Sequence, residues 1–224
     1  MGVMDATVAM VIGNREDADL GVLGEWADGR GIDLSTVNRE DDGLPPLDGC
    51  SLVVSLGSVW RVHDPALEPV LRAEQQLLRL AVAGGTQVLA ICFGMQQLTV
   101  AFGGEVYATD RPEIGFTFVE PRVPAIPRGP WMEYHYDACR LPPGAVALAA
   151  NGHGLQAYRL GSALAVQFHP EVDRAVVKRW SVASAGELEG LGLSAAWMVE
   201  DAEAHADEAR VAALALFDAF WSRR

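Results

Sequence analysis

One cysteine lies where a strand is expected to turn sharply into a helix. Residues 88–91 before it are apolar and β-prone, Gly94 follows it, and a helix-like pattern begins at Met95. This order places the sulfur of Cys92 at the apex of a turn and at the N-terminus of a helix, where the partial positive charge favours a thiolate. The pattern is the cysteine counterpart of the nucleophile elbow and predicts a covalent nucleophile.

A nucleophile of this kind needs a base, and the base needs a group that orients it. His169 ends the strand-like run 163–168 and is followed by Pro170 and Glu171. Residues two apart in an extended chain share a face, so Glu171 can hold the imidazole. The sequence therefore predicts a triad of Cys92, His169 and Glu171, whose members meet in space although they are far apart in the chain.

Two segments that carry this triad, ICFGMQ at residues 91–96 and QFHPE at residues 167–171, resemble the signatures of one enzyme family. That family is the class I, or triad-type, glutamine amidotransferases, and the resemblance is greatest to the amidotransferase domain of GMP synthetase and to stand-alone proteins built like it. It extends from about residue 8 to about residue 180. The resemblance implies hydrolysis of L-glutamine to glutamate and ammonia through a γ-glutamyl thioester.

The tetrahedral intermediate of such a reaction carries an oxyanion, which backbone N–H groups must stabilise. The resemblance implies that the amide of Phe93 is one donor. The second donor is expected in the loop after the strand-like run 51–56, at Gly57 or Ser58. The family often has two glycines in this loop, whereas this chain has Leu56 before a single glycine.

Two further places resemble substrate-binding parts of the family. Gln96 lies one helical turn after the nucleophile, and the resemblance implies that it contacts the substrate. Residues 131–137 resemble the loop that recognises the α-amino and α-carboxylate groups of glutamine. Backbone groups around Tyr134, His135 and Tyr136 are therefore expected to bind the substrate.

Strand-like and helix-like segments alternate over residues 7–91, which predicts a parallel sheet with right-handed crossovers. Active groups of such sheets lie at the carboxyl ends of the strands. Between residues 103 and 168, glycine and proline are frequent and apolar runs are short, which indicates antiparallel strands. Residues 187–202 and 207–221 have helical patterns.

The expected fold class is therefore α/β, with three layers. A mostly parallel central sheet has flanking helices, as in the flavodoxin-like amidotransferase fold that the resemblance implies, plus a small antiparallel section and C-terminal helices. We expect residues 1–185 to form the amidotransferase domain. Residues 186–224 are expected to form a helical extension packed on that same domain.

The composition of the chain limits the classes of partner that it is expected to bind. The 224 residues carry a net charge of −13, which disfavours binding to nucleic acids and anionic membranes. No apolar run has the length of a membrane span.

The start of the chain lacks the pattern of a signal peptide. Three widely spaced cysteines argue against disulfides and zinc, and fit a reducing cytoplasm. No phosphate-binding loop appears, so the chain is not expected to bind a nucleotide. Neither a cofactor nor a metal is predicted. The scarcity of lysine and the abundance of alanine suggest a bacterial source.

Three functional hypotheses follow. The leading one is a glutaminase subunit that delivers ammonia to a separate synthetase partner, because the chain itself carries no recognisable synthetase domain. The second is a stand-alone γ-glutamyl peptide or amide hydrolase with the same triad, in which Trp60, Tyr134 and Tyr136 shape a larger pocket. The third is a non-catalytic interaction subunit, against which the intact triad argues.

Overall fold

The computed structural model describes residues 7–41 and 43–222. Strands and helices alternate through the first half, as the sequence predicts. In chain order the elements are β1 (Thr7–Gly13), α1 (Gly21–Asp28), β2 (Ile32–Asn38), β3 (Cys50–Ser55), the short 3-10 helix η1 (Pro65–Leu67), α2 (Glu68–Gly84), β4 (Gln87–Ile91), α3 (Phe93–Ala101), β5 (Glu105–Thr117), β6 (Glu120–Pro121), β7 (Trp131–Arg140), β8 (Val146–Asn151), β9 (Gly154–Leu160), β10 (Ala163–Val166), α4 (Arg174–Ala183), α5 (Ala185–Gly190) and α6 (Ala195–Trp221).

An eight-stranded sheet forms the middle of the molecule, in the order β2-β1-β3-β4-β10-β9-β8-β6. The first five strands in this order are mutually parallel. The remaining three are joined antiparallel, and a separate antiparallel pair is made by β5 and β7. The fold class is thus the expected one: a mostly parallel α/β sheet with an antiparallel section and C-terminal helices.

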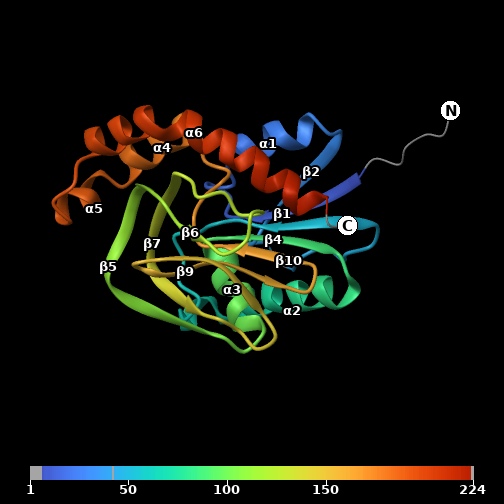
Figure 1. Ribbon diagram of the computed structural model, residues 1–224. Helices are drawn as coiled ribbons and strands as arrows, with labels where there is room; N and C mark the ends of the chain where they lie inside the picture. Colours follow the sequence, from blue (N-terminus) through green and yellow to red (C-terminus); the bar gives the residue numbers. More distant parts are fainter. Residues whose placement is uncertain (1–6, 42, 223–224) are drawn as a thin grey trace.

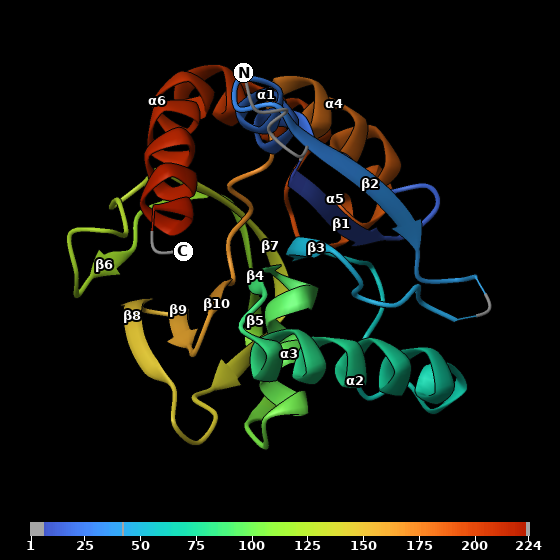
Figure 2. The ribbon, with the colours of Figure 1, turned by 90° about the vertical axis from the view of Figure 1, so that its right-hand side faces the viewer.

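Helices cover both faces of this sheet. Helices α1, α4 and α6 lie over one face and α2 and α3 over the other (Figures 1 and 2). Helix α6 completes the core of its layer, because the Trp26 ring of α1 packs against Phe217 and Trp221 with ring centroids 5.6 and 5.8 Å apart. Trp26 also donates a hydrogen bond to Asp218 of α6 at 2.9 Å. The C-terminal helix therefore packs on the same body as the sheet.

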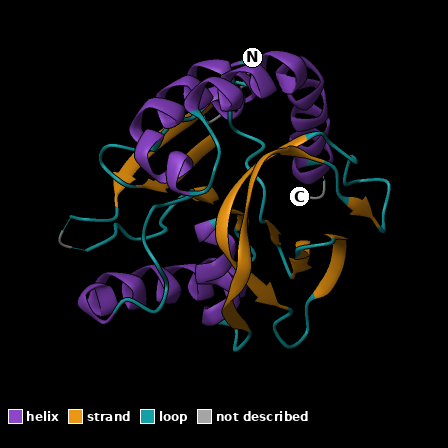
Figure 3. Cartoon of the chain, turned by 90° about the vertical axis from the view of Figure 1, so that its left-hand side faces the viewer, coloured by secondary structure: helices purple, strands orange, loops and turns teal. Residues whose placement is uncertain are grey.

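The β5–β7 pair forms a long curved ribbon beside the helical layer (Figure 3). Met132 of β7 is buried with Val176 of α4, Leu188 of α5 and Met198 of α6 in a separate small core. Among the described residues, no helix combines the length and the apolar character that crossing a bilayer requires.

The structure corrects the expectation for residues 131–137. These residues belong to strand β7 rather than to a loop. The alternation that marks a strand is hidden in the sequence, because Glu133 and His135 are polar yet buried. His135 contacts Glu113 of β5 as well as Glu133, and a local pattern cannot reveal that distant partner.

The structure differs from the sequence-based expectations in three smaller respects. The patterns at 187–202 and 207–221 belong mainly to one helix, α6, because no glycine or proline interrupts residues 195–221 and Ser194 caps its start. Helix α4 was not expected. Strand β10 is antiparallel to β9 on one side, as expected, but parallel to β4 on the other.

Candidate active site

Cys92 lies between β4 and α3 in a backbone conformation that L-residues rarely adopt, with φ 51° and ψ −105°. Such strain is typical of functional turns. Its amide donates a 2.8 Å hydrogen bond to the Val166 carbonyl at the end of β10. A Cβ at Gly94 would lie 2.1 Å from the Ser55 carbonyl oxygen, so only glycine lets α3 approach β3 this closely. The expected elbow is present.

His169 and Glu171 follow β10, the strand next to β4. The His169 amide donates a 2.8 Å hydrogen bond to the Met132 carbonyl of β7, which fixes the backbone of the histidine. Its Nδ1 lies 2.7 Å from Glu171 Oε1. The Glu171 carbonyl in turn accepts a 2.8 Å hydrogen bond from the Val22 amide of α1. Three elements therefore hold the imidazole–carboxylate pair.

The three predicted triad side chains come together and are almost fully buried, with Cys92, His169 and Glu171 3–5% exposed. Burial by itself lowers the pKa of His169, but the charge of Glu171 and hydrogen bonding with Cys92 and Glu171 outweigh it and raise this pKa well above its ordinary value. A histidine with a raised pKa readily takes the proton of a neighbouring thiol. The arrangement can thus generate a thiolate beside an imidazolium.

The predicted oxyanion loop lies against this pair. A Cβ on Gly57 would be 2.7 Å from His169 Cε1 and 3.7 Å from the Cβ of Cys92, so the loop approaches the site as only glycine allows. Phe93 is the first residue of α3. Within the described part of the chain, the amides of Gly57, Ser58 and Phe93 have no acceptor. They are available to an oxyanion at the sulfur.

These groups open into a cleft of about 800 Å³. All predicted substrate-binding residues line it: Gly57, Ser58, Gln96, Tyr134, His135 and Tyr136. The Tyr134 carbonyl lies 3.9 Å from the Cys92 sulfur. The Tyr134 and Tyr136 hydroxyls both donate to the carboxylate of Glu187 on α5, at 3.0 and 2.6 Å.

His135 lines the cleft, and its imidazole is buried between two carboxylates. Its Nε2 lies 3.0 Å from Glu113 and 3.2 Å from Glu133. Burial lowers the pKa of His135, but hydrogen bonds to both glutamates outweigh it and raise the value to about 10. Burial raises the pKa of Glu133 to about 7, against the opposing effect of His135. The His135 imidazole thus joins β7 to β5 through Glu113.

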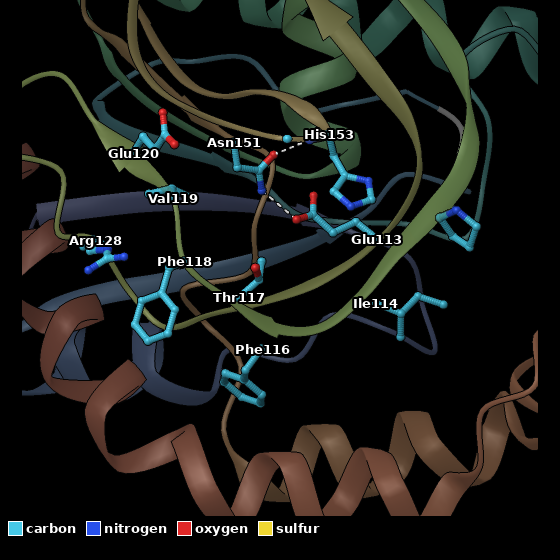
Figure 4. Close-up of a pocket in the computed structure, with 12 residues that line it drawn as sticks. Glu113, Ile114, Phe116, Thr117, Phe118, Val119, Glu120, Arg128, Asn151 and His153 are labelled. Atoms are coloured by element: carbon cyan, nitrogen blue, oxygen red, sulfur yellow. Dashed lines mark hydrogen bonds between the residues drawn. The ribbon is translucent and has the colours of Figure 1, made fainter.

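The same three side chains place possible metal-binding atoms within 4.8 Å of one another. The interactions described above account for them as an ionic cluster, and the expectation that the protein has no metal stays a prediction. Glu113 also borders a second hollow of about 460 Å³, where Asn151 donates to its carboxylate at 2.6 Å (Figure 4). This hollow does not contain the thiol.

Several cleft residues were not predicted. Trp180 of α4 packs edge-on against the His169 ring at 4.9 Å and donates to Asp17 in the β1–α1 loop at 3.2 Å. Burial raises the pKa of Asp17. Arg179 and Glu187 complete this wall. Only Trp180 left a signal in the sequence, as a large aromatic residue that follows the predicted triad glutamate, Glu171.

Comparisons with known proteins agree with this geometry. Residues 62–178, a range of 117 residues out of 224, match the family model "Glutamine amidotransferase class-I", and this range contains all three predicted triad residues. The GMP synthase [glutamine-hydrolyzing] of Aeropyrum pernix is 33% identical over 182 residues, which cover 74% of this chain and 32% of that protein. The chain thus spans about a third of the length of this curated relative.

Two solved structures are similar over nearly the whole chain. A glutamine amidotransferase from Thermotoga maritima has 26% identity and a TM-score of 0.87, with 96% of this chain and 97% of the other covered. A glutamine amido transferase from Methylobacillus flagellatus has 25% identity and a TM-score of 0.84, with coverage of 96% and 94%. By its matched range, its fold and the elbow cysteine, the chain belongs to the class-I glutamine amidotransferase family.

Proposed function

We propose that the protein hydrolyses L-glutamine to glutamate and ammonia with Cys92, His169 and Glu171 as its catalytic triad. His169 takes the thiol proton, and the thiolate adds to the side-chain carbonyl carbon of glutamine. The C–N bond then breaks, ammonia leaves with the proton that His169 returns, and a γ-glutamyl thioester remains. Water, activated by the same imidazole, hydrolyses the thioester and releases glutamate and the thiol.

The observation that carries this proposal is the 2.7 Å contact between His169 and Glu171 beside a strained elbow cysteine. Glu171 keeps the Nδ1 proton in place, which leaves Nε2 as the group that exchanges a proton with sulfur and nitrogen. The unengaged amides of Gly57 and Phe93 are the proposed oxyanion donors. Backbone groups of Tyr134 to Tyr136 and the side chain of Gln96 are the proposed substrate contacts.

The ammonia is proposed to pass to a separate synthetase. The curated relatives are GMP synthases that hydrolyse glutamine, and this chain spans only about a third of their length. The part of those relatives that lies outside the matched range is where an ammonia-accepting activity would be found. We propose that a cytoplasmic partner supplies this ammonia-accepting activity. The proposed reaction involves no nucleic acid, membrane or cofactor.

The proposal is tested by measuring glutamate and ammonia release by the purified protein and by two cysteine variants. Cys92→Ala should abolish release, because no other thiol faces the cleft in the described residues. Cys50→Ala at the start of β3 is the matched control and should retain it. Equal activity of both variants would disprove the assignment of the nucleophile.

The size of the cleft favours a second candidate, a hydrolase of larger γ-glutamyl amides. About 800 Å³ is more than glutamine alone requires, and Val59 and Trp60 line its outer part, with Val59 87% exposed. A ratio of kcat/KM that favours a γ-glutamyl dipeptide over glutamine would select this candidate. If neither substrate is turned over and a glutamine-like diazo-ketone leaves Cys92 unmodified, the chain is a non-catalytic subunit.

A further inference from the structure

A buried ion pair lies behind the predicted oxyanion loop. Arg39, just after β2, is 1% exposed, and Glu74, in the middle of α2, is fully buried. The Arg39 Nε lies 3.2 Å from Glu74 Oε2. Glu74 also accepts hydrogen bonds from Ser55 at 2.6 Å and from Gln97 at 3.4 Å. A pair buried this deeply is costly unless its hydrogen bonds are well made, so its further contacts matter.

Both Nη atoms of the guanidinium donate to the oxyanion loop, and Nη2 also donates to the Ile12 carbonyl at 3.4 Å. Nη2 donates to the Leu56 carbonyl and Nη1 to the Gly57 carbonyl, both at 3.1 Å. Nη1 also donates to the Asn14 side chain. Two consecutive carbonyls of the loop therefore bind one cation. In an extended strand consecutive carbonyls alternate in direction, so this contact fixes a local turn.

The direction of the carbonyls sets the direction of the amides. In a trans peptide unit the C=O and the following N–H point in opposite directions. With the Leu56 and Gly57 carbonyls on Arg39, the amides of Gly57 and Ser58 both point away from it. The outer side of Gly57 faces His169 and Cys92. Two successive N–H groups aimed the same way form a concave anion-binding feature. Here Gly57 lies next to His169 and Cys92.

Arg39 also contacts the other half of the predicted oxyanion hole. Its guanidinium carbon lies 5.0 Å from the centroid of the Phe93 ring, within cation–π range. Phe93 supplies the first amide of α3. One buried side chain therefore touches both segments that carry the proposed oxyanion donors.

We propose that Arg39, anchored by Glu74, is a positioning residue that presets the oxyanion hole. The proposal rests on the proposed function. A guanidinium suits the role because its planar fork binds two carbonyls and a carboxylate at once, which a lysine ammonium cannot do in the same geometry. Glu74 neutralises the buried charge and fixes the rotation of the fork. Leu56, where the family often has glycine, is compatible with this arrangement because its carbonyl, not its side chain, makes the contact.

The test uses the full chain with Arg39→Lys and Glu74→Gln. Arg39→Lys keeps the charge and removes the fork, and Glu74→Gln keeps the shape and removes the anchor, so the second variant serves if the first does not fold. Loss of one oxyanion donor typically lowers kcat by about 100-fold or more. We expect a fall of about 100-fold in kcat for glutamine hydrolysis by Arg39→Lys, with KM within about threefold. Rapid alkylation of Cys92 by iodoacetamide, which needs no oxyanion hole, should persist.

Two controls separate positioning from general damage. Arg72→Lys, in the exposed pair with Glu68 on α2, should leave kcat unchanged. Leu78→Ala, in the fully buried face of the same helix, lowers stability without touching the loop and should retain kcat per folded molecule. A crystal structure of Arg39→Lys should show the Leu56–Gly57 or Gly57–Ser58 peptide turned.

The outcomes are distinguishable from those for the proposed function. If wild type neither hydrolyses glutamine nor is modified by the diazo-ketone, the proposed function fails, whereas the crystal structure still tests the loop. If wild type is active and the folded variants keep its kcat, Arg39 has no positioning role. An unchanged loop in the variant structure, or alkylation that falls in parallel with kcat, would equally overturn the proposal.

Discussion

Replacing Glu171 with glutamine isolates the charge of the proposed triad carboxylate. Glu171 Oε1 lies 2.7 Å from His169 Nδ1, and Oε2 has no hydrogen-bond partner among the described residues. Glutamine has the same shape, so its carbonyl can accept the Nδ1 proton while its NH₂ takes the place of Oε2. The imidazole should keep its orientation and its tautomer and lose only the neighbouring negative charge.

The size of the effect follows from that contact. A hydrogen bond to a charged group contributes roughly 1.5–3 kcal/mol, and this pair is nearly fully buried, which favours the upper end. At about 1.36 kcal/mol for each factor of ten, kcat should fall by roughly 10- to 150-fold. A loss of about 10⁴-fold, as when a triad histidine adopts the wrong tautomer, is not expected.

The assay is steady-state glutamate release by Glu171→Gln, with Glu68→Gln on the exposed surface of α2 as the matched control. Because Glu171 raises the pKa of His169, the alkaline limb of the iodoacetamide alkylation profile should also move to lower pH in the variant. A change in kcat below about threefold would refute the reasoning. So would an alkylation profile identical to that of wild type.

Three other substitutions test the surrounding structure. Gly94→Ala places a Cβ 2.1 Å from the Ser55 carbonyl, so α3 must move by about 1 Å and kcat should fall by about 100-fold in the glutamate assay. Gly57→Ala places a Cβ 2.7 Å from the His169 ring, and kcat should fall at least about tenfold with little change in KM. The stability that the raised pKa of His135 provides is fully present below about pH 6.5 and is lost as pH rises through about 10. Urea unfolding should therefore show a loss of a few kcal/mol between pH 7 and pH 10 in wild type and a flatter profile in His135→Gln; parallel profiles would contradict this.

The proximity of the three proposed triad residues was predictable because each of them leaves a local signal. An apolar strand that stops at a cysteine and glycine identifies Cys92, and the spacing of His169 and Glu171 on an extended chain identifies the pair. The carboxyl ends of neighbouring parallel strands then bring these signals together, as β4 and β10 do here. Only the relative order of the strands had to come from the structure.

The supporting residues left no such signal. The contacts of Arg39 with Glu74, and of His135 with Glu113, join charged residues from distant segments, and charged residues in a sequence usually indicate exposed surface. For the same reason β7 was not predicted as a strand, since its buried Glu133 breaks the apolar alternation. Sequence patterns thus brought out the proposed reacting groups, and long-range pairing of buried charges determines what surrounds them.

The most direct test of the account is the mass of the protein after it is mixed with glutamine and quenched in acid within milliseconds. The account predicts a transient species heavier by one γ-glutamyl group, with the added mass on the peptide that contains Cys92 and absent from Cys92→Ala. Glutamate release without such a species, or with the added mass on Cys50 or Cys139, would contradict it.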